Sequence, residues 1–228
     1  MTEQIREPEW PRERSLSRYK ELTGIDIPAI LKDGGTWVDI GPGETMNAMN
    51  PLVGQDRLSL YAIGPHIRDV PKGIKFELGL VPDDQNFLNS LRGKAKLVTD
   101  IYGALSYAQN PLRVLIYGAM LIHGNGLFVG FTELLRIGDL ATWSRITNFF
   151  RSELNLGVSF QTVGVIGDAS GIFSACLRVV VSGDVPTSEN FFDVCARADA
   201  IVGRMSKAEA LWVSEDGLAT IWRTKYLT

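Results

Sequence analysis

The stretch "TWVDIGPGETM", residues 36–46, predicts both the fold and the position of a ligand site. A short run of apolar and β-branched residues carries one acid, Asp39, and leads straight into Gly41-Pro42-Gly43. A run of this length predicts a buried strand, and the glycines predict a turn whose backbone can approach a ligand closely. A carboxylate inside an apolar strand is costly unless it is paired. Asp39 is therefore a candidate site residue, and the alternative is a structural acid satisfied by nearby backbone N–H groups.

Beyond this stretch, apolar runs of strand length alternate with helical segments. Further strands are expected at 57–64, 74–79, 95–103 and 127–133. Helices are expected at 15–24, 83–93, 110–126 and 139–154, with shorter helical pieces within 27–35 and 44–53. Two β-rich stretches after residue 155 predict an antiparallel hairpin, followed by a helix over 187–205 and a last strand within 217–227.

Strands that alternate with helices predict an α/β fold. We expect an open, mostly parallel twisted sheet with helices on both faces and an antiparallel edge hairpin. Residues 1–33 read as an N-terminal arm with short helices, and residues 34–228 as a single Rossmann-like domain. The chain has 228 residues without an internal repeat or a low-complexity linker, which agrees with one domain.

Composition limits the partners. The chain is 45% hydrophobic and 21% charged with a net charge of −3, so nucleic acid is not expected as a partner. Its two cysteines and two histidines lack the spacing of a zinc site. The charged N-terminus has no apolar signal region, and Arg113, His123 and a Gly-Asn-Gly break divide the apolar stretch 112–131. We expect a cytoplasmic protein with no membrane partner, and the sequence leaves open a homodimer.

The glycine turn distinguishes between ligand classes. A P-loop is excluded because no Gly-Lys-Ser/Thr follows. A dinucleotide turn needs a third glycine where Met46 stands, and Glu44 would repel a pyrophosphate. "WVDIGPGET" instead resembles the first motif of the class I S-adenosylmethionine-dependent methyltransferases, which has an acidic residue on the strand followed by Gly-x-Gly-x-Gly. Residues 35–182 are similar to this family in the order and spacing of their segments.

The resemblance implies S-adenosyl-L-methionine as cofactor, bound at the ends of the strands. The implied contact residues are Asp39, Gly41, Pro42, Gly43, Thr45, Gly64, Leu80, Asp100, Ile101 and Tyr102. The sequence departs from the family at three of these positions. Thr45 replaces the third glycine of the motif. The second strand of the family usually ends in an acidic residue, but this chain has Ile63 and Gly64 there. The third strand usually also ends in an acidic residue, and this chain has Leu80 at that position.

The resemblance implies transfer of a methyl group to a small-molecule or protein acceptor. Candidate bases are Asp100, His66 and Glu133, each at or just after a strand end. For Asp100 the alternative is a cap of the following loop or helix. A methyltransferase-like binding or scaffold protein without catalysis is the second hypothesis, because the acid of the second strand is missing. A nicotinamide-dependent oxidoreductase is a third and is opposed by the missing glycine.

Overall fold

The computed structural model describes residues 14–43, 46–65, 69–108, 110–133, 140–167, 172–183, 189–202, 210–214 and 219–222. Within these residues, nine strands form one sheet in the order β3-β2-β1-β4-β5-β7-β8-β9, and β6 pairs with β7. The parallel part of the sheet consists of β1 (Gly35–Ile40), β2 (Leu58–Gly64), β3 (Ile74–Leu78), β4 (Ala95–Ile101) and β5 (Ile122–Glu133). The predicted parallel sheet is confirmed.

The antiparallel edge is also confirmed. The strands β6 (Gly157–Gly167) and β7 (Ile172–Ser182) form the hairpin expected after residue 155, and β7 runs antiparallel to β5. A second hairpin, β8 (Ala210–Ser214) and β9 (Ala219–Trp222), extends from β7. The strand expected within 217–227 is β9, whereas β8 was not predicted from the sequence.

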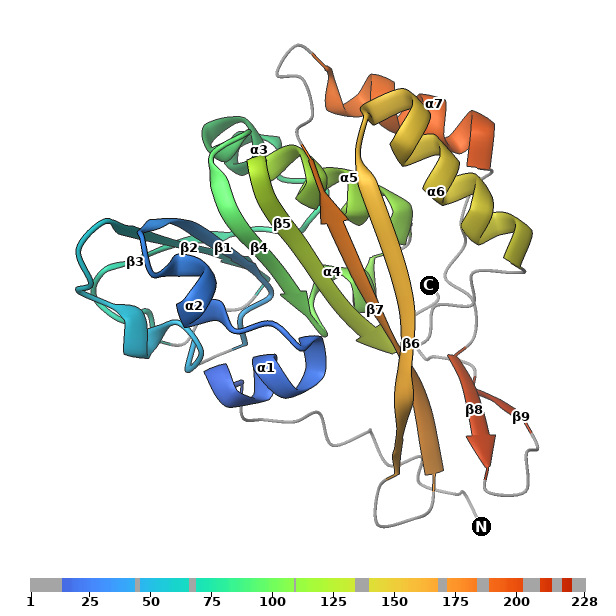
Figure 1. Cartoon of the computed structure of the whole chain (residues 1–228), viewed down its shortest axis with the longest axis horizontal. Helices are drawn as coiled ribbons and strands as arrows, with labels where there is room; N and C mark the ends of the chain where they lie inside the picture. Colours follow the sequence, from blue (N-terminus) through green and yellow to red (C-terminus); the bar gives the residue numbers. More distant parts are fainter. Residues whose placement is uncertain are drawn as a thin grey trace.

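Helices cover both faces of the sheet (Figure 1). One apolar cluster contains residues of α1 (Leu16–Thr23) and α2 (Ile27–Leu31) together with Trp37 of β1. The other cluster contains residues of α3 (Gln85–Leu91), α5 (Pro111–Leu121), α6 (Leu140–Leu154) and α7 (Phe191–Val202), together with Val38. Trp37 and Val38 lie in different clusters because neighbouring side chains of a strand point to opposite faces.

The segment that joins β1 to β2 differs from the prediction. In place of the short helix expected within 44–53, its described part forms one 3-10 turn, Asn50–Leu52. Pro51 lacks the N–H that a continuing helix needs, and Met46 has a φ of 51°, which is left-handed. Glu44 and Thr45 lie outside the described residues. The helices α1 and α2, which precede β1 in the chain, share the apolar cluster on this face with Met46, Met49 and Leu52 of the joining segment.

The predicted boundary between the helix over 110–126 and the strand over 127–133 is corrected, and one further helix is added. The helix expected over 110–126 ends at Leu121, and β5 begins at the next residue, because the chain is extended at Ile122. A short helix, α4 (Ala104–Tyr107), follows β4 and was not predicted. No helix in the described part of the chain has the length and apolar character that a membrane span requires.

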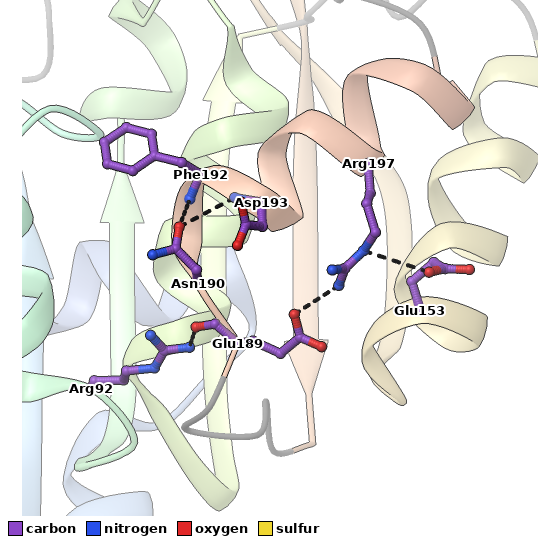
Figure 2. A network of polar contacts seen from close by, with 7 residues as sticks. All are labelled: Arg92, Glu153, Glu189, Asn190, Phe192, Asp193 and Arg197. Atoms are coloured by element: carbon purple, nitrogen blue, oxygen red, sulfur yellow. Dashed lines mark hydrogen bonds and ion pairs between the residues drawn. The ribbon is translucent and has the colours of Figure 1, made fainter.

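A polar network fixes α7 beside α6 (Figure 2). Asn190 caps α7, and its side chain accepts hydrogen bonds from two N–H groups of the first turn. Arg197 of α7 binds Glu189 at 2.8 Å and Glu153 of α6 at 3.7 Å, and Arg92 donates to the Glu189 carbonyl. These groups are partly solvated, so the network orients α7 more than it stabilises the fold.

Candidate functional site

The turn after β1 presses against the turn after β4. Gly41 and Gly43 have φ values of 68° and 79°, which only glycine adopts without strain. The N–H of Gly41 donates to the carbonyl of Ile63 at the end of β2, at 2.7 Å. A Cβ on Gly41 would lie 2.8 Å from the Cα of Gly103 in the second turn. The glycine at position 41 is therefore required by a close approach of two backbones.

The strand order reverses between β1 and β4, since β2 and β3 lie on one side of β1 and β4 and β5 lie on the other. In open α/β sheets, ligands bind outside the carboxyl ends of the strands at this reversal. The two turns meet there, so the structure places Gly41, Gly43 and the end of β4 at the position predicted for a ligand.

Asp39 is completely buried at this position. Its carboxylate accepts hydrogen bonds from the hydroxyl of Tyr19 at 2.7 Å and from the hydroxyl of Thr99 at 2.6 Å. Thr99 stands directly opposite Asp39 on β4, and its oxygen also accepts from the indole N–H of Trp37 at 2.9 Å. The pairing groups are thus side chains on neighbouring elements, not the backbone N–H groups of the structural alternative. Burial raises the pKa of Asp39 to about 6, although the two hydroxyl bonds oppose the shift.

Tyr19, which belongs to α1, is also completely buried. Burial, with the Asp39 charge as a smaller cause, raises the pKa of its hydroxyl well above the ordinary value, so it stays a donor. Its ring meets the Trp37 ring edge to face, with centroids 6.2 Å apart. A buried tyrosine needs a partner for its hydroxyl, and a buried acid needs a donor. The sequence contained both halves of this pair but gave no signal that joined them.

Asp100 is equally buried but points to the other face of the sheet, because its neighbour across β1 is Ile40 rather than Asp39. Its two carboxylate oxygens accept from the backbone N–H groups of Gly103 at 2.9 Å and Leu105 at 3.0 Å. Asp100 therefore caps the turn into α4, as the structural alternative predicted. Burial raises the pKa of Asp100 to about 7, despite these bonds.

Tyr102 continues the turn after β4. Its φ of 52° is left-handed, and its N–H donates to the carbonyl of Phe131 on β5 at 2.8 Å. The two rings meet edge to face with centroids 5.4 Å apart. The carbonyl group of Tyr102 accepts a hydrogen bond from Arg14. The preceding residue, Ile101, is buried in the core.

Arg14 binds both turns and was not predicted as a site residue. Its guanidinium donates to the carbonyl of Gly41 and, at 3.3 Å, to the carbonyl of Tyr102. Its side chain also packs beside Gly43, where an added Cβ would lie 3.1 Å from the Arg14 Cδ. The sequence assigned the residues before the first helix to an arm, so nothing local indicated that an arginine there reaches the strand ends.

The other predicted residues are placed unequally. Gly64 is buried at the end of β2 close to Pro42, since a Cβ on it would lie 3.6 Å from the Pro42 Cδ. Leu80 follows β3 and is 59% exposed. Glu133 ends β5, and its side chain lies outside the described part. Thr45 and His66 also lie outside the described residues.

The order and direction of seven strands identify the fold. Reading across, they follow the order β3-β2-β1-β4-β5-β7-β6, with β7 antiparallel to both neighbours. The chain has a Rossmann-like methyltransferase fold. The classic dinucleotide-binding sheet instead has the strand order 3-2-1-4-5-6.

Comparisons with solved structures found distant similarities. A structure described as a ribosomal RNA methyltransferase from Plasmodium falciparum is 13% identical, with a TM-score of 0.47 over 76% of this chain and 98% of that chain. The antibiotic-resistance methyltransferase Kmr is 14% identical, with a TM-score of 0.44 over 69% and 92%. A precorrin 8W decarboxylase from Methanobacterium thermoautotrophicum is 14% identical, with a TM-score of 0.43 over 78% and 96%. No family profile and no curated protein matches the chain. These distant similarities assign no substrate, and the strand order carries the fold assignment.

The residues at the reversal fit a cationic ligand. Two carbonyl oxygens converge there, and a cation already binds them, namely the guanidinium of Arg14. The buried carboxyl groups of Asp39 and Asp100 lie near enough for the Arg14 charge to oppose the rise in the pKa of both.

Proposed function

We propose that the chain is an S-adenosylmethionine-dependent methyltransferase that acts on a small-molecule or protein acceptor. The observation that carries the proposal is the contact between the two turns at the strand reversal, where carbonyl groups converge on a cation beside a buried acid. The fold supports it, because several solved structures to which the chain is distantly similar are methyltransferases.

The residues that would hold the cofactor are those at the two turns. The carbonyl groups of Gly41 and Tyr102 would accept from its ammonium group, and Asp39 would supply negative charge beneath the turn. Gly43 keeps the surface of the turn free of a side chain. Gly64 and the exposed Leu80 flank the turn at the ends of β2 and β3. The bound cofactor would supply an electrophilic methyl group, and transfer of that group needs no metal.

The chain's own acids have different capacities for proton transfer. A pKa of about 7 would suit Asp100 to accept a proton near neutral pH. Both of its oxygens, however, are held by backbone N–H groups, and the side chain is fully buried. We therefore assign Asp100 to positioning the turn after β4, and the acceptor's own acidity or a residue outside the described part would govern deprotonation.

A second candidate is a methyltransferase-like protein that binds without catalysis. Two observations favour it: Arg14 lies on the two turns, and β2 ends in Gly64, which offers no carboxylate to a ribose. The two candidates differ first in affinity for the cofactor, which the methyltransferase requires and the scaffold protein does not.

Calorimetric titration with S-adenosylmethionine and S-adenosylhomocysteine tests the proposal. We expect the wild type to bind both, and Gly43→Val to abolish binding because its branched side chain fills the turn and strains a φ of 79°. Gly54→Val is the matched control, since Gly54 has a φ of 80° with nothing within 4 Å of an added Cβ. It carries the same backbone strain away from the site. Absence of binding by the folded wild type would refute the methyltransferase and leave the second candidate.

A further inference from the structure

The side chain of Arg14 joins the two turns of the candidate site. Its guanidinium donates a hydrogen bond to one carbonyl group in each turn, that of Gly41 after β1 and that of Tyr102 after β4. Arginine is suited to this bridge because its planar guanidinium directs several N–H donors in fixed directions. The aliphatic part of the side chain lies over Gly43, so the open side of the glycine turn is covered as well.

The guanidinium of Arg14 lies where a ligand is expected to bind. The turns lie at the strand reversal, outside the carboxyl ends of β1 and β4. Arg14 also brings a positive charge close to the buried Asp39 and Asp100. A cationic ligand bound to the same two carbonyl groups would meet the guanidinium directly and would be repelled by it.

The helix α1, which follows Arg14, is held independently of it. Tyr19 anchors α1 through its bond to Asp39. Arg178 of β7 donates to the carbonyl of Thr23 at the end of α1, at 2.5 Å, where the helix dipole favours a cation. Ser15 caps the start of the helix. Arg14 precedes this cap, so its side chain can leave the two turns while α1 stays in place.

We propose that Arg14 is an internal competitor for the ligand: its guanidinium occupies the carbonyl groups of Gly41 and Tyr102, and a cationic cofactor binds only when Arg14 leaves them. The inference rests on the proposed function. It makes the observed arrangement a closed state of the site. Because a competent state that is populated in only a fraction of molecules reduces the apparent affinity by that fraction, removing the guanidinium tightens binding.

The test compares wild type, Arg14→Met and Arg18→Met by calorimetry with S-adenosylmethionine and by thermal unfolding without ligand. Methionine keeps the length of the arginine stem but has no N–H donor. Arg18 lies in α1 and pairs with the exposed Glu21, so Arg18→Met is the matched control. We expect Arg14→Met to bind about tenfold more tightly while its ligand-free melting temperature falls by about 2–4 °C. Arg18→Met should leave affinity unchanged.

The opposite signs separate competition from other roles. If Arg14→Met loses both affinity and stability, Arg14 is a structural or ligand-binding residue and the inference is overturned. Unchanged affinity in Arg14→Met beside a binding wild type also overturns it and leaves the proposed function standing. If neither protein binds the cofactor, both proposals fall. Binding by Arg14→Met alone would show that Arg14 closes the site in the wild type, which would then stand as the second candidate, a methyltransferase-like protein without catalysis.

Discussion

The ends of β1 and β4 each bury one carboxyl group, and the two groups are paired in different ways. Asp39 relies on Tyr19 from α1 and on Thr99 from the next strand, so its pairing requires distant segments to dock. Asp100 relies on Gly103 and Leu105, which lie within five residues of it. One acid is satisfied by tertiary structure and the other by its own loop. The β4 end can therefore form locally, whereas the β1 end is complete only when α1 is in place.

Substitutions at the contact between the turn after β1 and the turn after β4 should have the largest effect on stability. Gly41→Ala places a Cβ 2.8 Å from the Cα of Gly103 and forces alanine to adopt a φ of 68°. We expect a loss of about 3 kcal/mol in the free energy of unfolding, measured by denaturant titration, from strain and overpacking together. Gly54→Ala is the control, with a positive φ but open space, and should lose about 1 kcal/mol. Equal losses in the two variants would mean that the turns are not in tight contact.

The same comparison explains what the sequence could predict. The parallel strands and the first hairpin follow from local patterns, and Asp100 was a candidate cap whose partners are close in the sequence. Arg14 and Tyr19 were missed because their partners lie 20 residues or more away. The helix expected after β1 was wrong, because Pro51 cannot continue a helix and the described part of the segment forms only one 3-10 turn. Local chemistry thus predicted the elements, and only packing brought the site together.

The two acids should also differ in their effect on stability against pH. Each carboxyl group has a folded pKa above its ordinary value of 3.8, at about 6 for Asp39 and about 7 for Asp100. The folded state therefore binds protons more tightly than the unfolded chain, so stability falls as pH rises from about 4 and levels off above the folded pKa. The slope is at most about 1.4 kcal/mol per pH unit for each group.

Denaturant titrations from pH 4.5 to 8 check this behaviour. Asp39→Asn should remove the part of the fall that ends near pH 6, and Asp100→Asn the part that ends near pH 7. A stability that rises over this range and is unaffected by either substitution would contradict the burial of two ionisable groups at the strand ends.

Removing the distant donor tests the tertiary half of the comparison. Tyr19→Phe deletes the hydroxyl that donates to Asp39 at 2.7 Å and leaves Thr99 as its remaining donor. We expect a loss of about 1–2 kcal/mol at pH 8, where the carboxylate is charged, and a smaller loss at pH 5, where it is protonated. Tyr117→Phe is the matched control, because its hydroxyl donates at 2.7 Å to the uncharged carbonyl of Asp84. The loss in that variant should not vary with pH, and a pH-independent loss in Tyr19→Phe would show that Asp39 is not its partner.

The weakest effect concerns how α1 begins. The hydroxyl of Ser15 accepts from the N–H of Arg18 at 3.3 Å and caps the helix that carries Tyr19 to Asp39. Ser15→Ala should cost about 0.5–1 kcal/mol, whereas Ser15→Gly should cost only a few tenths, because glycine is tolerated at this position. Amide hydrogen exchange would then quicken in α1 before it quickens in β4, since the cap acts on the segment that docks last. Equal exchange rates in the two elements of Ser15→Ala would instead mean that α1 and the end of β4 open as one cooperative unit, and the distinction between a tertiary and a local acid would lose its energetic basis.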